Sequence, residues 1–356
     1  PVVLARRETR LKNVDLVFAS SVFFRELSRD RIRRMQAFYG DALTVGGSGV
    51  DVRKRLPEAI ESLPPDTSLY PELADRGIGF LTRGCPFRCP FCIVPVKEGK
   101  PRQVSTLDEL LPDGRKKLIL LDDNILAHPK ALDLLEDMAV RGVAVNFTQT
   151  LDLRLIDKEK VGLLQRIRCT NLRFTRSVYH FSLNDANDLE ALRERYALFG
   201  LSSRDNAEFI CMFGFNTTLA EDVARFRFLR SLPGAYVFMQ RYRPIPGGPP
   251  PRLEGFFDDR ADELIDELIR IIFTQNMKSV ERYYHWVSRE YALKFGRLHQ
   301  GLVDAIFKYN NRERKGLYMA TLAGLRPLKD IRSPVKSGGA HFTQFITCDD
   351  NEMSRP

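Results

Sequence analysis

Three cysteines, Cys85, Cys89 and Cys92, lie close together in the run Thr-Arg-Gly-Cys-Pro-Phe-Arg-Cys-Pro-Phe-Cys-Ile-Val-Pro. Their spacing is CxxxCxxC, whereas the other three cysteines of the chain are scattered. Six cysteines are too few for a disulfide scaffold in a chain of 356 residues, so this tight group indicates a metal site. Three thiolates on one short loop can bind three irons of a [4Fe–4S] cluster and leave the fourth iron open.

Two other uses of the cysteines have to be weighed. A structural zinc needs four closed ligands, but no cysteine or histidine follows Cys92 within 30 residues, and the nearest is His128. A catalytic disulfide needs two cysteines and leaves the third without a role. The spacing therefore favours the iron–sulfur cluster. A zinc-stabilised RNA-binding module is the alternative from another functional class.

The loop resembles the signature of the radical S-adenosylmethionine (radical SAM) superfamily, both in its spacing and in the aromatic Phe91 just before the last cysteine. The resemblance covers about residues 76–250. It implies that the open iron binds S-adenosylmethionine, which is reductively cleaved to methionine and a 5′-deoxyadenosyl radical that abstracts a substrate hydrogen. It also implies an electron donor such as flavodoxin or ferredoxin. The substrate, whether small molecule, peptide or RNA, is unknown from the motif.

Polar residues that end the second expected strand, at 117–123, are the first candidates for the S-adenosylmethionine site. This chain has Asp122, Asp123 and Asn124 where the superfamily commonly has Gly-Gly-Glu, whose position accepts from the ammonium group of the cofactor. A carboxylate or amide oxygen can accept a charge-assisted hydrogen bond there. We expect Asp123 or Asn124 to lie in the site, with capping of the turn as the alternative role of Asp122.

Further candidates follow the later strands. Gln149 and Arg154 could bind the cofactor carboxylate or the substrate, and the alternative for Arg154 is a surface ion pair with Asp152. The resemblance places ribose contacts at the end of the fourth strand and adenine or substrate contacts at the fifth and sixth. The residues at these positions are Ser182, Asn184, Asn216 and Tyr242. His180 is more simply interpreted as a core histidine.

The elements that would position these residues alternate between strand and helix. Apolar runs predict strands at 77–83, 117–123, 143–150, 178–183, 209–215 and 236–242. Helical spacing follows at 131–142, and Thr217-Thr-Leu-Ala-Glu221 is typical of a helix start. The alternation predicts an α/β fold with a parallel sheet, and the resemblance implies a partial (β/α)6 barrel over 76–250 with ligands at the carboxyl ends of the strands.

A smaller β-α-β unit is predicted upstream, with strands at 14–20 and 42–49 and a basic helix at 24–38. This Rossmann-like segment, within a first domain of 1–75 that ends in a proline-rich linker, resembles the cobalamin-binding-like domain upstream of many radical SAM proteins. The cobalamin-ligating Asp-x-His-x-x-Gly motif is absent. Cobalamin is thus a possible cofactor, and a cobalamin-dependent radical SAM methylase is an alternative function. The glycine turn at 46–49 is interpreted as a tight turn rather than a phosphate cradle.

The region 251–356 is predicted to be a helical C-terminal extension. Residues 261–295 and 302–309 have helical spacing, which indicates a lid or a packing layer, and 333–356 are expected to be mobile. The run at 244–251, rich in proline and glycine, would close the barrel.

Composition sets the remaining bounds. The chain is 44% hydrophobic and 28% charged with a net charge of +9, which is an ordinary globular composition of about two domains. Arginines at 166–176 could contact RNA phosphates, although solvated faces are the commoner use of such residues. No apolar run is long enough to span a bilayer, so we expect no membrane partner. With no signal peptide we expect a cytoplasmic protein, and its start at Pro1 suggests a fragment that lacks its true N-terminus.

Overall fold

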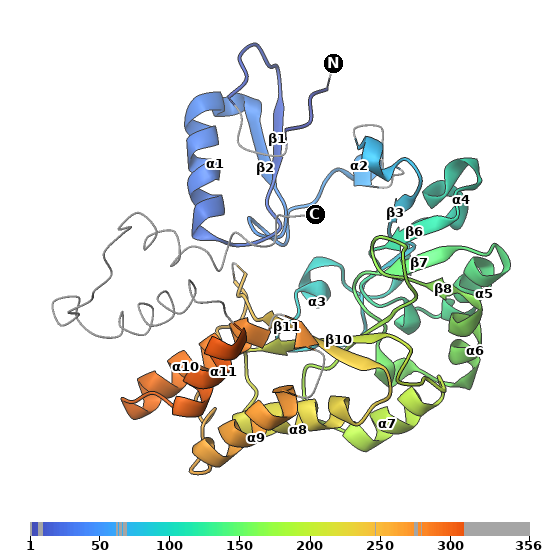
Figure 1. Ribbon diagram of the computed structural model, residues 1–356. Coiled ribbons are helices and arrows are strands. Elements are labelled where there is room, and N and C mark those ends of the chain that lie inside the picture. The colour runs from blue at the N-terminus through green and yellow to red at the C-terminus, as the bar shows by residue number, and fades with distance from the viewer. Residues whose placement is uncertain are drawn as a thin grey trace.

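The structure is a computed structural model that describes residues 2–5, 10–61, 63, 66, 70–245, 247–273, 277–278 and 280–309. The expected mobile tail at 333–356, together with Cys348, lies outside these residues. Within them the protein is a mixed α/β structure with parallel sheets, as the alternation of apolar runs predicts. Figure 1 shows the N-terminal unit apart from the larger body, whose helices α5 to α9 follow one another along the outer side of the strands.

The predicted β-α-β unit is present at the N-terminus with narrower bounds. It consists of β1 (Val17–Ser20), α1 (Glu26–Tyr39) and β2 (Leu43–Gly46), and the two strands pair in parallel. A Cβ at Gly49 would lie 2.4 Å from the backbone of Phe23, so a side chain does not fit where the turn packs against the loop after β1. This close approach supports the tight-turn interpretation of the glycines at 46–49.

The larger body contains all six predicted strands, with shifted bounds, and its parallel sheets include two further short strands that the sequence does not predict. The six are β3 (Gly77–Gly79), β6 (Lys117–Leu120), β7 (Ala144–Phe147), β9 (Tyr179–Ser182), β10 (Ala207–Phe213) and β11 (Ala235–Arg241). The additional strands are β8 (Arg168–Cys169) and β12 (Met277–Lys278). They form two parallel sheets, in the orders β3-β6-β7-β8 and β12-β11-β10-β9. A parallel bridge between Leu151 and Phe181 joins the segment after β7 to β9.

The first predicted strand, 77–83, is wrong in its second half. The strand ends at Gly79 because the carboxylate of Asp122 accepts hydrogen bonds from the amides of Leu81 and Thr82, which turns the chain out of the sheet. The following pair β4 (Thr82–Arg83) instead lies antiparallel to β5 (Arg102–Gln103). The two short strands form the base of the cysteine loop.

Helices cover the sheets and close the core. They are α2 (Glu58–Glu61), α3 (Val94–Lys97), α4 (Leu107–Leu110), α5 (Ala131–Val140), α6 (Lys158–Arg166), α7 (Leu189–Ala197), α8 (Leu219–Arg230), α9 (Ala261–Phe273), α10 (Val280–Phe295) and α11 (Gln300–Tyr309). Helix α8 begins with the predicted capping box, in which Thr218 and Glu221 exchange hydrogen bonds with each other's backbone amides. None of the helices in the described part of the chain is both long and apolar enough to cross a membrane.

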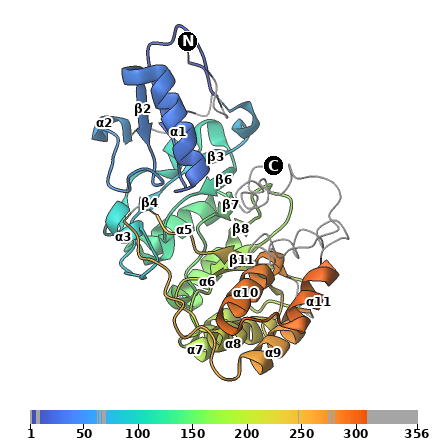
Figure 2. The same ribbon diagram turned by 90° about the vertical axis from the view of Figure 1, so that its left-hand side faces the viewer.

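The helical spacing at 261–295 belongs to two helices rather than one. Strand β12 interrupts it and pairs with β11, so the sheet extends into the C-terminal region. One continuous hydrophobic core runs from Leu81 to Ile306 and includes buried residues of α9, α10 and α11. These helices therefore form a packing layer on the sheets and not a separate lid (Figure 2).

A fully buried ion pair connects this packing layer to the strand ends. Asp222 and Arg225 on α8 are both inaccessible to solvent, and the hydroxyl of Tyr283 on α10 donates to Asp222 at 2.6 Å. The Arg225 guanidinium donates to the carbonyl oxygens of Leu183, at 3.0 Å, and of Met212, at 3.1 Å. A buried guanidinium is stable only when it is paired and hydrogen-bonded in this way. The network fixes the backbone at the carboxyl end of β9.

Candidate functional site

The three cysteines lie on the loop between β4 and β5, and backbone geometry closes the loop at its base. The amide of Cys85 donates to the carbonyl oxygen of Gly99 at 3.1 Å. Gly84 has a φ of +92°, and a Cβ there would lie 2.3 Å from the carbonyl oxygen of Lys100. Each of the three thiols is half-buried. The local sequence thus presents three sulfur atoms on one closed loop.

The carboxylates that end β6 hold this loop in place. Asp122 is buried and accepts from the amides of Leu81, at 2.7 Å, and Thr82, at 2.8 Å, and from the Thr82 hydroxyl. Asp123 accepts from the amide of Gly84, the residue before the first cysteine, at 2.8 Å. The alternative role of Asp122, capping of a turn, is the one that the structure gives it. Both carboxylates act on the chain that leads into the cysteines.

Asn124 contacts the loop directly. Its Nδ2 lies 3.7 Å from the Cys85 sulfur and donates to Asp152 at 3.2 Å. Its Oδ1 is buried and has no hydrogen-bond partner among the described residues. An unsatisfied buried acceptor costs free energy unless a ligand or water meets it, so this oxygen fits a bound group that carries an N–H or O–H donor.

Asp152 and Arg154 extend the contact to the outer part of the loop. Arg154 donates to Asp152 through Nε at 2.9 Å and Nη2 at 2.7 Å, which is a bidentate ion pair. The Arg154 guanidinium also lies 4.1 Å from the centre of the Phe87 ring, within the cysteine loop. The ion pair expected as the alternative role of Arg154 therefore exists, and it also brings Arg154 to the cysteines.

An aromatic row runs from the cysteine loop to the end of β11. Phe91 packs edge-to-face against Phe215 at 6.0 Å, and Phe215 lies 4.6 Å from Tyr242. The Tyr242 hydroxyl donates to the carbonyl oxygen of Pro249 at 2.7 Å, which fixes the loop after β11. Phe91 and Tyr242, separated by 150 residues in the sequence, thus belong to one contact network.

The remaining predicted residues are not joined to the loop by any contact among the described residues. Ser182 is half-buried at the end of β9. Asn184 accepts from the amide of Met212 at 3.0 Å and so supports β10. Gln149 and Asn216 are exposed. His180 lies 3.8 Å from Glu208, in agreement with a structural role.

Sequence reasoning missed two residues of this network. The sequence predicts Asp152 only as a surface partner of Arg154, yet Asp152 also accepts from Asn124 and so links the ends of β6 and β7. Phe215 was interpreted as part of a strand, although it connects Phe91 to Tyr242. The sequence carries no signal for either contact because both depend on how separate strands meet in space.

Burial makes the thiols of Cys85 and Cys92 less acidic. Burial raises the pKa of Cys85. It also raises the pKa of Cys92 to about 11, although a hydrogen bond from the Val94 amide to the Cys92 sulfur acts in the opposite direction. Thiols of this kind are protonated at neutral pH, and a bound metal would have to displace the protons. Within the part of the chain that the structure describes, no three histidine, cysteine or acidic side chains converge on a single metal ion.

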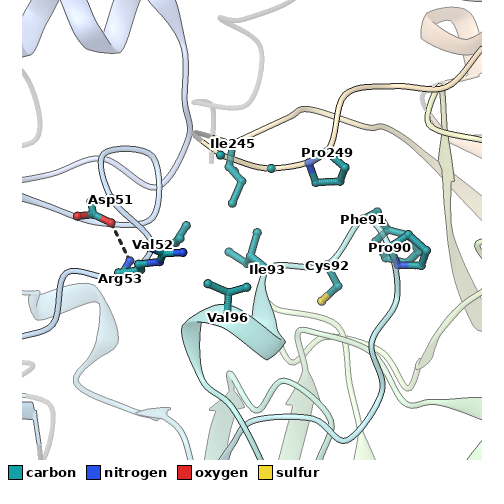
Figure 3. A pocket seen from close by; sticks show the side chains of 12 residues that line it. Asp51, Val52, Arg53, Pro90, Phe91, Cys92, Ile93, Val96, Ile245 and Pro249 are labelled. Atoms are coloured by element: carbon teal, nitrogen blue, oxygen red, sulfur yellow. Dashed lines mark hydrogen bonds between the residues drawn. The ribbon is translucent and has the colours of Figure 1, made fainter.

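Two cavities flank the loop. The first, of about 450 Å³, lies between the N-terminal unit, the cysteine loop and the proline-rich loop, as Figure 3 shows. Its lining includes Arg53, Phe91, Cys92, Val96 and Ile245. The second, of about 540 Å³, lies on the side of the linker and β5 and includes both Arg83 and Arg102. Of the three cysteines of the loop, Cys92 lines the first cavity.

Comparison with known proteins gives a partial match in sequence. No protein-family model matches the chain. A bacteriochlorophyllide d C-12(1)-methyltransferase of Chlorobaculum tepidum is 34% identical over 94 residues, which correspond to 23% of this chain and 20% of the relative. The match thus spans about a fifth of the length of that relative.

Solved structures overlap with about half of the chain. Streptococcus suis SuiB bound to S-adenosylmethionine covers 56% of this chain and 48% of its own, with a TM-score of 0.38 and 11% identity. A methylornithine synthase, PylB, covers 57% of this chain and 65% of its own, with a TM-score of 0.34 and 15% identity. TM-scores this low do not establish a common fold.

We predict that Asp122 makes stability depend on pH. Burial raises its pKa from the ordinary value of 3.8 to about 7. Below about pH 4 both folded and unfolded states are protonated, and between pH 4 and 7 only the unfolded state ionises, so the free energy of unfolding falls as pH rises. Urea unfolding from pH 4 to 8 should show that the free energy of unfolding falls more for the native chain than for Asp122→Asn. Parallel pH profiles would contradict this assignment.

We predict that Asp152 holds the outer part of the cysteine loop through Arg154. In Asp152→Ala the guanidinium loses its partner and its place over Phe87. If the variant loses about 1 kcal/mol of the local stability of the loop, the population in which the loop is locally unfolded rises about fivefold. Mass spectrometry should then detect faster tryptic cleavage after the exposed Arg88. In the control, Asp157→Ala, which removes an exposed helix cap, cleavage at Arg88 should be unchanged; equal rates in both variants would exclude the positioning role.

Proposed function

We propose that this protein is a radical SAM enzyme, in which Cys85, Cys89 and Cys92 hold a [4Fe–4S] cluster and the fourth iron is open to S-adenosylmethionine. The observation that carries the proposal is the attachment of a three-thiol loop to the carboxyl ends of β6 and β7 through Asp123, Asn124 and Asp152. Ligands of parallel α/β sheets bind at this end of the strands. The donor set fits a cluster, since thiolates that bind separate irons need not converge on one point.

The zinc alternative has less support. A structural zinc needs four ligands around one ion, and the described side chains do not provide such a group. Of the arginines at 166–176, Arg166 forms a bidentate pair with Glu136. The polar residues around the cysteine loop would have no role in a zinc module.

The residues of the chain have distinct tasks in the proposed enzyme. The open Oδ1 of Asn124 would accept from the cofactor ammonium, and Asp123 would keep the loop close to it. Arg154 beside the loop would face the cofactor carboxylate. Phe91 would contribute an apolar wall that excludes water from the cluster. Ser182 and Asn184 would contact the ribose, and Gln149, Asn216 and Tyr242 remain predicted contacts of the cofactor or substrate.

When bound, the reduced cluster would supply one electron to the sulfonium of S-adenosylmethionine, whose C–S bond would break to give methionine and a 5′-deoxyadenosyl radical for hydrogen abstraction from the substrate. We further propose that the two sheets function as one partial (β/α)6 barrel in the order β3-β6-β7-β9-β10-β11. The bridge between Leu151 and Phe181, with an amide-to-carbonyl bond of 2.7 Å from Leu151 to His180, supports this continuity. The electron would come from a donor such as flavodoxin or ferredoxin.

A cobalamin-dependent radical SAM methylase is the second candidate, and one observation favours it. The first cavity is lined by residues that follow β2, by the cysteine loop and by residues that follow β11 (Figure 3). At about 450 Å³ the cavity is smaller than a whole cobalamin, so the cofactor would occupy it only in part, between the Rossmann-like unit and Cys92. The partial sequence match to a methyltransferase agrees with this candidate. None of the described residues that line the cavity is a histidine, so cobalamin would bind there without a histidine ligand from this lining.

We predict that the reconstituted and reduced protein cleaves S-adenosylmethionine to 5′-deoxyadenosine. Cys85→Ala, Cys89→Ala and Cys92→Ala should each abolish cleavage, because each removes an iron ligand. The matched control is Cys211→Ala, which removes a buried thiol remote in sequence from the loop. Chromatographic measurement of 5′-deoxyadenosine decides the outcome. Full cleavage by any of the three loop variants would overturn the proposal.

We predict for the second candidate that hydroxocobalamin binds in the first cavity. Val96 is exposed at the rim of the cavity, and Val96→Trp would fill part of it. This variant should bind hydroxocobalamin at least tenfold more weakly, as measured by titration at visible wavelengths, where tryptophan does not absorb. Val140→Trp, the same substitution at another exposed valine, on α5, is the control. If the native chain fails to bind cobalamin, or if both variants bind equally, this candidate is excluded.

A further inference from the structure

The buried ion pair of α8 determines how the sheet ends between β9 and β10. Arg225 is inaccessible to solvent, and its Nη1 donates to the carbonyl oxygens of Leu183, at 3.0 Å, and Met212, at 3.1 Å. Its Nη2 forms the ion pair with Asp222. The guanidinium therefore bridges the two strand ends from the side of the helices.

This bridge interrupts the parallel ladder at one step. The last regular bond between the strands runs from the amide of Leu183 to the carbonyl oxygen of Ile210 at 3.0 Å. In a continued ladder the amide of Met212 would be the next donor, and its acceptor would be the carbonyl oxygen of Leu183. Arg225 binds that carbonyl, and Met212 donates instead to the side-chain Oδ1 of Asn184 at 3.0 Å.

The diverted hydrogen bond fixes the orientation of the Asn184 side-chain amide. A backbone N–H can only donate, so the atom of Asn184 that meets Met212 has to be the oxygen. The Nδ2 of Asn184 is then left without a hydrogen-bond partner among the residues that the structure describes. Asn184 is half-buried, so a small molecule can reach it. It therefore offers an N–H donor to a ligand that binds at this strand end.

Tyr283 links the ion pair to helix α10. Its hydroxyl donates to Asp222 at 2.6 Å, so one carboxylate oxygen of Asp222 accepts from Tyr283 and the other from Arg225. The Tyr283 ring packs edge-to-face against Phe213 at 5.1 Å and Phe226 at 5.5 Å, which holds the hydroxyl in place. We call Asp222, Arg225 and Tyr283 the buried network.

We propose that the buried network positions Asn184 so that its Nδ2 donates to a ribose hydroxyl oxygen of S-adenosylmethionine. This inference rests on the proposed function, which places the ribose at the end of β9. A hydroxyl oxygen has lone pairs that accept such a bond. The three network residues are inaccessible to solvent, so they are positioning residues that act on the cofactor through Asn184.

The energetics of burial support a positioning role. A buried ion pair contributes little net stability, because the desolvation of both charges offsets their attraction. Apolar side chains of similar volume on α8 would fill the same space and leave the carbonyl oxygen of Leu183 free to continue the ladder. The guanidinium provides what apolar side chains do not, which is a pair of donors that diverts the ladder and orients Asn184.

The first experiment tests the contact of Asn184 by binding rather than by turnover. Equilibrium dialysis of the reconstituted protein without reductant gives the dissociation constants of S-adenosylmethionine and of its 2′,3′-dideoxy analogue. We expect the native chain to bind the analogue about tenfold more weakly, and Asn184→Ala to reduce this ratio about threefold or more. The matched control is Asn187→Ala, at an exposed asparagine of the same loop, which should keep the native ratio.

The second experiment tests the buried network by the same ratio. Tyr283→Phe leaves one oxygen of Asp222 without its donor, so the guanidinium and the strand ends can rearrange, and the ratio should fall about threefold. The matched control is Tyr196→Phe, at a buried tyrosine whose hydroxyl donates to the carbonyl oxygen of Pro233, before β11 begins. Each variant loses one buried hydrogen bond, so a general loss of stability would lower both ratios alike.

The outcomes separate this inference from the proposed function. If the native chain binds no S-adenosylmethionine, the proposed function fails. If it binds both compounds equally, or if Asn184→Ala keeps the native ratio, the contact of Asn184 with the ribose is wrong. If Asn184→Ala lowers the ratio but Tyr283→Phe and Tyr196→Phe have the same ratio as each other, the positioning role of the buried network is overturned.

Discussion

The site depends on the hydrogen bonds that two adjacent carboxylates accept from the backbone just before the cysteine loop. Asp122 draws Leu81 and Thr82 out of the sheet, and Asp123 holds Gly84 immediately before Cys85. Buried carboxylates are costly, and these are tolerated because backbone amides satisfy them. The same interaction therefore ends β3, starts the loop and fixes the position of the first thiol relative to β6.

Much of the fold could be predicted because the strands of a parallel sheet are continuous apolar runs. All six strands predicted for the larger body and the predicted β-α-β unit are present. The errors have physical causes: the first strand ends early through a side-chain contact with Asp122, and β12 pairs with β11 although its sequence interrupts a helical pattern. Short elements of this kind depend on tertiary contacts that no local pattern records.

The candidate site was predictable in part for the same reason. Cys85, Cys89 and Cys92 could be found because their spacing is local. Asn124 could be found from its place at a strand end, but its open Oδ1 and its contact with Asp152 depend on the meeting of two strands. The cations around the buried Glu98 likewise come from separate segments, since Arg55 of the linker and Arg83 of β4 both lie within ion-pair distance of its carboxylate. Proximity in space, rather than residue type, separates the predicted residues that contact the loop from those that do not.

The central claim is that three thiolates hold a cluster with one open iron. Its most direct test is the iron and sulfide content of the anaerobically reconstituted chain, together with the electron paramagnetic resonance spectrum of the reduced protein before and after addition of S-adenosylmethionine. We predict about four irons and four sulfides per chain and a spectrum that changes when the cofactor is added. Stoichiometric zinc without iron, or a cluster whose spectrum the cofactor leaves unchanged, would contradict the account.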